Sequence, residues 1–422
     1  MLVSAKPLSL LGLALSLLSA QAQSNWPGWR GPRDNGSTGQ GTYPVRCDPS
    51  NALWTARLPG KGCSTPVIWN KRIFLTAPSN GLDAVLGFDW NGKRLWLTSL
   101  GAESPGSYRD SSGCNPSPAT DGHSIFVRFK SGTLAALDLD GKHLWQTNLV
   151  QGFGPDTLYW DQGTSPVLTP KDVVVVRMHH GGSWLAAFDK LTGQMRWKVD
   201  RNYETPVEDD HAYTAPVLIQ HEAKPALLVW GAQHLTAYDA ADGKLLWSCG
   251  DFNPQALANC PSVASPVVAG DVAVIAWGRA DRGQPRLYGI KLGGDGDVTA
   301  THRLWKREDT GTYVPTPAEY KGRIYLLRDR GEIECLDPVT GKTLCKDAFP
   351  RSIRNFYASP LVAGDHLYAA REDGELFVAR IKDKFELLSE YSLGEQVIAS
   401  PVAVDNRLFI RGERHLFCFA GN

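Results

Sequence analysis

The chain has 422 residues, and its 44 Lys and Arg are balanced by 44 Asp and Glu. This balance excludes a global field of the kind that attracts nucleic acid or an anionic membrane surface. Length alone predicts two or three domains, but 42 Gly and 27 Pro indicate many tight turns, and helix signals are sparse along the whole chain.

Residues 1–22 have the pattern of a signal peptide. Lys6 supplies a short basic region, "LSLLGLALSLL" an apolar core too short to span a membrane, and Ala20-Gln21-Ala22 a cleavage site that leaves Gln23 as the first mature residue. Because that residue is not cysteine, we expect no lipid anchor. No later stretch reaches the ~18 apolar residues of a transmembrane helix, so the sequence predicts an exported, soluble protein, periplasmic or secreted.

Residues 23–46 form a segment rich in Gly and Pro, with "WPGWRGPRDNGSTGQGTYP" at its centre. Such a composition is incompatible with a regular helix or strand. We expect Trp26 and Trp29 to anchor this strap to the rest of the protein. Two roles remain open for it: a strap that plugs one face, or a segment that also takes part in ligand binding.

Residues 47–422 contain a repeated unit that is clearest from Ser117 to Trp145, "SPATDGHSIFVRFKSGTLAALDLDGKHLW". A Pro opens the first strand, where its missing N–H is tolerated. "SIFVRF" and "TLAALDL" are typical of strands, and the Asp-Gly and Ser-Gly pairs between them are turn signals. The unit therefore predicts four short antiparallel strands.

The unit recurs eight times, with spacings from 41 residues (Pro360 to Pro401) to 52 (Pro66 to Pro118). Four-stranded repeats of this period predict a β-propeller, here an all-β fold of eight four-stranded antiparallel blades. The opening prolines are Pro66, Pro118, Pro166, Pro216, Pro266, Pro317, Pro360 and Pro401. A Trp closes the fourth strand in five copies, at Trp96, Trp145, Trp197, Trp247 and Trp305, and Cys345 takes that place in the sixth. We expect these residues to be structural.

The eighth copy supplies only three strands before the chain ends, whereas "NALWTARL" with Trp54 stands alone before the first copy. We therefore expect this N-terminal strand to complete the last blade, which removes the two most exposed sheet edges.

Eight cysteines in an exported protein favour disulfide bonds. Cys249 and Cys260 bracket one loop; the other pairs join the ends of the ring, adjacent blades, or facing strands of one hairpin, where the two residues are opposed directly or diagonally. The candidate pairs are Cys249 with Cys260, Cys63 with Cys114, Cys335 with Cys345, and Cys47 with Cys418. Neither a CxxC motif nor a Cys/His zinc spacing is present, so no metal site is predicted.

In a propeller the loops between blades and between the two middle strands share one face, the funnel face. The longest of these loops carry aromatic and charged side chains, which suit a carbohydrate, a peptide or a flat cofactor. Candidate ligand-binding residues on them are Tyr159, Trp160, His211 and Arg354. "VEDDH" and His179-His180 do not match a known metal-binding spacing.

The second strand ends in Arg in five blades, at Arg128, Arg177, Arg328, Arg371 and Arg411, and Trp277 lies near that place in another. Equivalent positions in a ring lie on one circle, so these guanidiniums are expected to surround one mouth, and anion binding there is one of two open roles for them. The alternative is a set of local ion pairs with neighbouring acidic residues.

The repeat, with its "SP", "GD", "DG" and "TGK" turns and closing Trp, resembles the pyrroloquinoline-quinone (PQQ) propeller repeat over residues 50–420. The leader "WPGWRGP" is similar to the opening of secreted PQQ-like propellers. The resemblance implies the blades. The same repeat occurs in quinoprotein dehydrogenases and in the cofactor-free propeller lipoprotein of outer-membrane barrel assembly. The adjacent cysteines of the dehydrogenases and the lipid-attachment cysteine of the lipoprotein are both absent here.

Two functions follow from these observations. The favoured one is a non-catalytic binding or scaffold module for a protein, glycan or anionic ligand, with no cofactor. The alternative is a dehydrogenase of alcohols or sugars that uses PQQ and calcium. In that case arginines of the funnel would pair with the quinone carboxylates, Trp160 or Trp277 would stack on the quinone, and Asp161 or Asp209 would act as the base.

Overall fold

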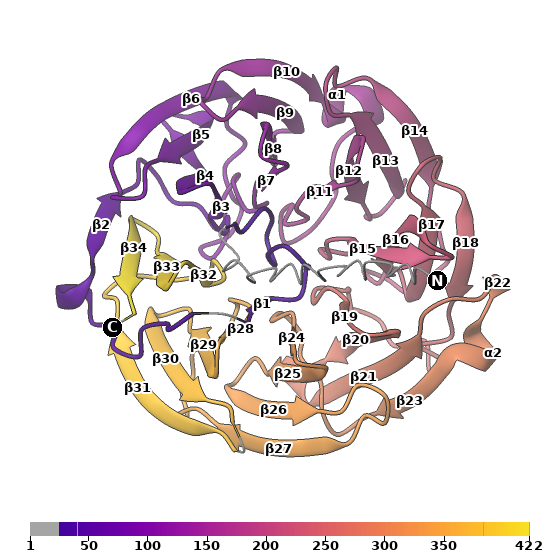
Figure 1. Ribbon diagram of the computed structural model, residues 1–422. Helices are drawn as coiled ribbons and strands as arrows, with labels where there is room; N and C mark the ends of the chain where they lie inside the picture. Colours follow the sequence, from indigo (N-terminus) through magenta and orange to yellow (C-terminus); the bar gives the residue numbers. More distant parts are fainter. Residues whose placement is uncertain (1–24, 40, 383, 422) are drawn as a thin grey trace, which may run out of the picture.

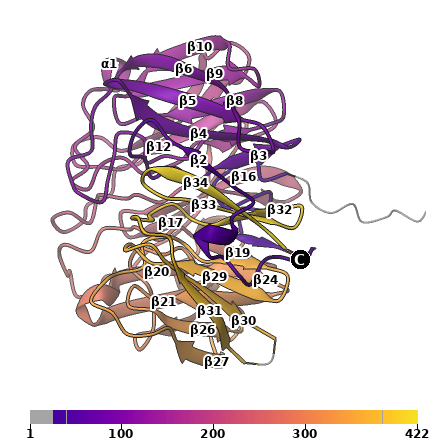
Figure 2. The same cartoon turned by 90° about the vertical axis from the view of Figure 1, so that its left-hand side faces the viewer.

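The computed structural model describes residues 25–39, 41–382 and 384–421, and the predicted signal peptide, residues 1–22, lies outside them. Eight sheets stand around one central axis (Figure 1), and the edge-on view shows a thick disc (Figure 2). The predicted all-β, eight-bladed propeller is therefore confirmed. Among the described residues no helix is long and apolar enough to cross a membrane.

The first four blades follow the chain from the centre outwards. Blade 1 contains β3 (Val67–Trp69), β4 (Arg72–Ser79), β5 (Leu82–Phe88) and β6 (Arg94–Ala102). Blade 2 contains β7 (Ala119–Thr120), β8 (Ser124–Arg128), β9 (Thr133–Asp138) and β10 (His143–Asn148). Blade 3 contains β11 (Val167–Leu168), β12 (Asp172–Arg177), β13 (Trp184–Asp189) and β14 (Met195–Asp200). Blade 4 contains β15 (Val217–His221), β16 (Lys224–Gly231), β17 (His234–Asp239) and β18 (Leu245–Cys249), with β22 (Gly296–Asp297) added at its outer edge.

The other four blades repeat the pattern. Blade 5 contains β19 (Val267–Ala269), β20 (Val272–Arg279), β21 (Gln284–Lys291) and β23 (Arg303–Arg307). Blade 6 contains β24 (Ala318–Tyr320), β25 (Arg323–Leu327), β26 (Glu332–Leu336) and β27 (Thr343–Ala348). Blade 7 contains β28 (Leu361–Ala363), β29 (His366–Ala370), β30 (Glu375–Arg380) and β31 (Glu386–Ser392). Blade 8 contains β32 (Val402–Val404), β33 (Arg407–Arg411) and β34 (His415–Ala420). The helices are short: α1 (Leu149–Phe153), α2 (Thr299–His302) and the 3-10 turns η1 (Pro49–Asn51) and η2 (Ala280–Arg282).

The N-terminal strand β2 (Trp54–Arg57) completes blade 8, as the sequence predicts. It pairs antiparallel with β34, and Trp54 lies opposite Cys418. The Trp54 indole N–H donates to the carbonyl of Trp90 in blade 1 at 3.0 Å. The closing strand therefore also ties the last blade to the first.

The tryptophans that close the fourth strands pack against the next blade. Trp96 donates its indole N–H to the carbonyl of Leu139 at 3.1 Å, and its ring lies so close to Gly141 that a Cβ there would come within 2.4 Å. Gly is required because it turns the hairpin at positive φ and leaves room for the indole. The same Trp-on-Gly contact recurs at Trp54 and Gly92, Trp145 and Gly193, Trp197 and Gly243, and Trp305 and Gly341.

Around the axis, the hydroxyl residues just before the opening prolines form a hydrogen-bonded ring, which we call the hydroxyl collar. Each backbone N–H donates to the side-chain oxygen of the equivalent residue in the next blade. The donors and acceptors are Thr65 to Ser117, Ser117 to Ser165, Ala215 to Ser265, Ser265 to Thr316, Thr316 to Ser359, Ser359 to Ser400 and Ser400 to Thr65, at 2.9 to 3.1 Å. The link from Ser165 is missing because Ala215 has no hydroxyl.

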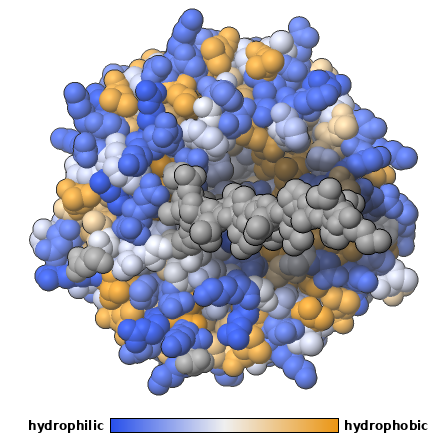
Figure 3. All heavy atoms as spheres, in the orientation of Figure 1, coloured by the Kyte–Doolittle hydropathy of each residue, from blue (hydrophilic) through white to orange (hydrophobic). Residues whose placement is uncertain are grey.

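The strap crosses one face of the ring from blade 1 to blade 7. Trp26 is buried and bridges Ile68 in blade 1. The buried Arg30 guanidinium donates to the carbonyls of Pro317 and Pro360 at 3.0 Å. The short strand β1 (Ser37–Thr38) then pairs in parallel with β28. Outside the grey atoms, this face shows polar and apolar residues interspersed (Figure 3).

Candidate functional site: an axial cavity among the inter-blade loops

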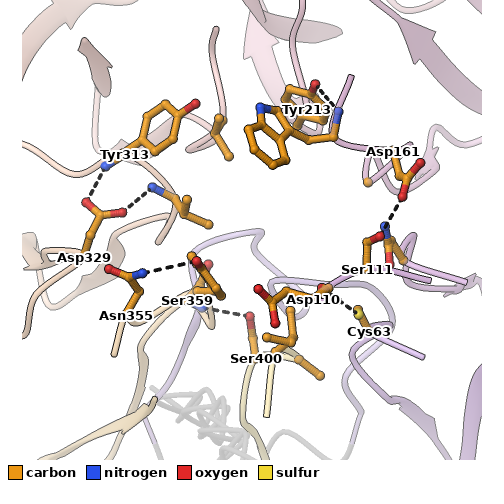
Figure 4. A pocket seen from close by; sticks show the side chains of 18 of the residues that line it. Cys63, Asp110, Ser111, Asp161, Tyr213, Tyr313, Asp329, Asn355, Ser359 and Ser400 are labelled. Atoms are coloured by element: carbon orange, nitrogen blue, oxygen red, sulfur yellow. Dashed lines mark hydrogen bonds between the residues drawn. The ribbon is translucent and has the colours of Figure 1, made fainter. Parts of the chain in front are cut away.

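A cavity of about 430 Å³ lies on the propeller axis, and its wall takes residues from all eight blades. We call it the funnel cavity. Trp29 of the strap lines it and also lines a smaller cavity of about 180 Å³ beside the strap, so this residue lies between the two. Figure 4 shows labelled lining side chains around an open centre. The strap thus covers one face and contributes Trp29 to the cavity wall. Its share in ligand binding stays a prediction.

Much of the cavity wall comes from one repeated position in the sequence. The residue three positions before each opening Pro lines the cavity in every blade, and we call these eight residues the inner ring. They are Cys63, Asn115, Gly163, Tyr213, Val263, Val314, Tyr357 and Ile398. The hydroxyl collar two residues later holds each of these positions on the axis. Gly163 is the smallest member, and a Cβ built on it would have no neighbour within 4 Å, so blade 3 leaves the wall open.

Three aromatic side chains form a shelf at the mouth of the cavity. Tyr108 packs against Trp160 with ring centroids 4.7 Å apart, and Tyr159 contacts both. Tyr159 is 55% exposed and Trp160 46% exposed, although large aromatic side chains are usually covered. The Trp160 backbone N–H donates to the Tyr213 hydroxyl at 2.9 Å, which fixes the shelf to the inner ring. The predicted ligand-binding residues Tyr159 and Trp160 therefore lie together at the mouth.

Asp161 lines the cavity, but all its hydrogen-bonding capacity is used. It accepts from the Ser107 backbone N–H, the Ser107 and Ser111 hydroxyls and the Lys130 ammonium, the last at 2.6 Å. Burial alone raises the pKa of Asp161, yet the bonds from Lys130, Ser111 and Ser107 bring it below the ordinary value. Asp161 is thus an ionised residue that orders the loop rather than a free base.

Apart from Arg330, the other charged groups of the wall are also held by an ion pair or by backbone N–H groups of the protein. Arg279 binds Asp281 through two nitrogens at 2.8 and 2.6 Å. Asp110 binds Arg109 at 3.0 Å, and Arg109 also reaches Glu372 of blade 7 at 3.1 Å. The buried Asp329 accepts the backbone N–H groups of residues 313 and 314 at 2.8 and 2.9 Å, and burial raises its pKa. These bonds fix the loops around the mouth.

Neutral polar groups face the cavity between these pairs. Tyr213, Tyr313 and Tyr357 are half-buried. Burial raises the pKa of Tyr213 and of Tyr313, so both phenols keep their protons and can donate. The Asn355 side-chain amide donates to the Tyr357 hydroxyl at 3.2 Å. The interior of the cavity is therefore rich in uncharged hydrogen-bonding groups.

The predicted circle of arginines around the mouth is wrong, because none of the five lines the cavity. Arg128 donates to the carbonyl of Val176 in blade 3, and Arg177 donates to the carbonyls of residues 153 and 154. Arg411 binds Ser64 of blade 1, Arg371 forms an ion pair with Asp373, and Arg328 is half-buried. The period of the repeat places these residues equivalently, but, apart from Arg328, their side chains bond neighbouring segments or their own turn.

The remaining candidates are also away from the cavity lining. Trp277 is 3% exposed in the core of blades 4 and 5, so it has no open face for stacking. His211 is buried, and Arg354 is exposed on its loop. Asp209 is buried, accepts from the Cys260 backbone N–H at 2.7 Å and has its pKa raised to about 6 by burial. The structure therefore contradicts two predictions, namely that Trp277 stacks on a ligand and that Asp209 acts as a base at the cavity.

All eight cysteines are free thiols. Cys335 and Cys345 lie directly opposite each other on β26 and β27, which resolves the direct or diagonal alternative. Cys47 and Cys418 belong to the same buried cluster at the ring closure. None of the predicted pairs, including Cys63 with Cys114 and Cys249 with Cys260, is joined as a disulfide in the structure.

The residues of the cavity do not fit the calcium-bound quinone of the alternative function. The quinone carboxylates need several cations, but of the two arginines in the lining Arg279 is already bound to Asp281, which leaves only Arg330 without a carboxylate partner. Calcium needs several oxygen ligands, and within the described ranges no group of three His, Cys, Asp or Glu side chains is arranged to hold a metal. We therefore derive no chemistry from that cofactor.

Trp29 as a cavity residue, Tyr313 and Asp329 were not predicted from the sequence. A usable signal was present: Tyr213, Tyr313 and Tyr357 each stand three or four positions before an opening Pro. Comparing that position across all copies identifies the inner ring directly.

Two of three comparisons with known proteins found matches, and both agree with this architecture. A family model described as "Outer membrane protein assembly factor BamB" matches residues 48–202 and 150–292, more than half of the chain. No curated protein matches the chain. Among solved structures, BamB from Moraxella catarrhalis is 14% identical with a TM-score of 0.62, covering 87% of this chain and 99% of that chain.

A quinohemoprotein alcohol dehydrogenase from Comamonas testosteroni is 14% identical with a TM-score of 0.67, covering 96% of this chain and 81% of that chain. Sqt1 from Saccharomyces cerevisiae is 12% identical with a TM-score of 0.62, covering 88% and 99%. At these identities the structural likeness shows the fold alone. The match of the family model, together with the eight four-stranded blades, shows that this chain belongs to the PQQ-repeat propeller family described by the assembly factor BamB.

Proposed function

We propose that this protein is an exported, non-catalytic binding module that captures its ligand in the funnel cavity. The observation that carries the proposal is the cavity itself, about 430 Å³ on the axis of a closed ring. This volume lies within the range of about 300–1,000 Å³ typical of small-molecule sites. Export rests on the leader sequence, residues 1–22.

The walls of the cavity are preorganised, which favours binding. The hydroxyl collar joins seven of the eight possible links around the axis. The loop around Arg109 is tied across the mouth to Glu372 of blade 7. A ligand entering the cavity therefore meets walls already held in place.

The carboxylates support binding rather than acid–base catalysis. Asp161 accepts four hydrogen bonds from Ser107, Ser111 and Lys130 of neighbouring loops, and Asp209 is outside the lining. Membership of a family described by an assembly factor also favours a binding role.

The test uses a variant that fills the cavity. Gly163→Phe adds a large side chain where a Cβ has open space, and Gly152→Phe is a matched control on the exposed helix α1, away from the cavity. Thermal shift is measured with neutral hexasaccharides, phosphate and sulfate, a library of short peptides, and PQQ with calcium. We expect at least one class to raise the melting temperature of the wild type and of Gly152→Phe but not of Gly163→Phe. Equal shifts in all three proteins, or no shift with any class, would contradict the proposal.

A further inference from the structure

We infer that the funnel cavity takes a neutral carbohydrate, with a sugar ring stacked on the shelf of Tyr108, Tyr159 and Trp160. This inference rests on the proposed function, because it names the ligand class of the same site. It follows from three properties of the wall: all its charged groups except Arg330 are already held by an ion pair or by backbone N–H groups, its mouth exposes aromatic faces, and its interior offers uncharged hydrogen-bonding groups.

The paired charges argue against an ionic ligand. Asp161, Asp281 and Asp110 each hold a cation of this chain at 2.6 to 3.0 Å. Asp329 is satisfied by two backbone N–H groups. Except at Arg330, a charged ligand would have to break such a pair and would leave its partner desolvated. An uncharged ligand leaves all of them intact.

Arg330 is the exception within the described lining. Its guanidinium donates to the carbonyl of Ile353 at 2.6 Å and has no carboxylate within ion-pair distance. An acidic sugar would pair its carboxylate with this single exposed cation, whereas a neutral sugar would not. The experiment therefore includes an acidic oligosaccharide.

The shelf supplies the apolar part of the recognition. Tyr159 and Trp160 expose about half of their surface at the mouth. The C–H faces of a pyranose ring are apolar and flat enough to pack on an aromatic face, while its hydroxyls stay at the edge. The three aromatic side chains of the shelf are set at 41° to 82° to one another. They form a curved surface, which fits a chain of sugar rings better than one planar molecule.

The interior supplies the polar part. The Tyr213 hydroxyl accepts the Trp160 N–H and keeps its own proton to donate. Together with Tyr313, Tyr357 and Asn355, it lines the cavity with groups that both donate and accept. Sugar hydroxyls also both donate and accept, so these partners are complementary.

Isothermal titration calorimetry of the full mature protein tests the inference. The probes are cellohexaose, xylohexaose, laminarihexaose and maltohexaose as neutral sugars, with hexagalacturonate and a library of short peptides as charged comparisons. The variants are Trp160→Ala, Tyr159→Ala, Gly163→Phe and the control Gly152→Phe. Melting temperatures show whether each variant is folded, and Tyr159→Ala serves if Trp160→Ala is not.

We expect a neutral hexasaccharide to bind the wild type and Gly152→Phe equally. Removing a shelf residue should weaken it by about tenfold or more, the loss expected for a central aromatic contact, and Gly163→Phe should abolish binding.

Two other results overturn the inference in different ways. If only hexagalacturonate binds, and Gly163→Phe abolishes its binding, the ligand is an acidic carbohydrate rather than a neutral one. If only a peptide binds, and Gly163→Phe abolishes its binding, the ligand is not a carbohydrate. The proposed function stands in both cases. If no probe loses affinity in Gly163→Phe, both the ligand class and the proposed function fail.

Discussion

The backbone N–H of Ser400 donates a hydrogen bond to the side-chain oxygen of Thr65 at 3.1 Å. These residues are 335 positions apart, and their bond joins the collar of the last blade to that of the first. The residues two positions before each of them, Ile398 and Cys63, line the funnel cavity. Closure of the ring and construction of the site therefore depend on the same short segments.

Removing the acceptor of this bond should weaken the ring. Thr65→Val keeps the shape of the side chain but leaves the buried Ser400 N–H without its partner, which costs about 1–3 kcal/mol in the free energy of unfolding. Ala215→Ser supplies the missing hydroxyl of the collar and should stabilise by about 0.5–1.5 kcal/mol. Chemical denaturation measures both. Unchanged stability in the two variants would show that the collar contributes nothing.

The Trp-on-Gly contacts predict a steric effect that can be separated from backbone strain. In Gly141→Ala the new Cβ would lie 2.4 Å from the Trp96 ring, at φ +83°. Overpacking of this kind costs about 1–3 kcal/mol, in addition to the cost of positive φ. Gly81→Ala has a similar φ of +74° and open space around its Cβ, so it measures the backbone cost alone. Thermal unfolding should rank Gly141→Ala below Gly81→Ala, and equal losses would mean that the contact with Trp96 is unimportant.

Trp54 anchors the closing strand β2, so replacing it should destabilise the closed ring. Trp54→Ala removes a bond to blade 1 and the packing on Phe409 and Gly92, and should lower the free energy of unfolding by about 3 kcal/mol. Its neighbour Leu53 is 50% exposed, so Leu53→Ala should stay within about 0.5 kcal/mol. Limited proteolysis should then cut Trp54→Ala faster near its ends. Identical digestion of both variants would argue against closure through β2.

The buried carboxyl group of Asp83 should make the free energy of unfolding depend on pH. Asp83 is 0% exposed and accepts from the Ser131 hydroxyl, and burial raises its pKa from 3.8 to about 7. Between about pH 4 and pH 7 the folded state therefore binds more protons at Asp83 than the unfolded state, so the contribution of this group to the free energy of unfolding falls as pH rises. Asp83→Asn should abolish that contribution and be more stable than the wild type at pH 8. Parallel stability curves for the two proteins from pH 4 to pH 8 would contradict this assignment.

The sequence predicts the fold well because the fold is a repeated local pattern. Each copy of the repeat carries its own opening Pro and turns, and five copies carry a closing Trp, so the number of blades and the role of Trp54 follow from counting. Cys345 in the place of a Trp keeps its register opposite Cys335. The same reasoning fails for the arginines of the second strands, because a repeat gives the position of Arg128 or Arg411 but not the direction of its side chain. The carbonyls of the neighbouring blade attract these guanidiniums inwards, away from the mouth.

The candidate site is only partly predictable. Tyr159, Trp160 and Asp161 stand on a long loop with an evident aromatic and acidic character, and the structure places them at or near the cavity. The state of Asp161 depends on Lys130 and Ser107, which come from two other loops, so no local pattern reveals it. Trp29 precedes the repeats, and its place at the axis depends on how Arg30 anchors the strap to blades 6 and 7.

The most direct test of ligand capture in the funnel cavity is a crystal structure of the protein with the tightest-binding hexasaccharide. We predict electron density for a sugar ring against Trp160, with the chain entering the cavity above Trp29. Density for the sugar only on the outer strands or beside the strap, with the funnel cavity holding water, would contradict the account.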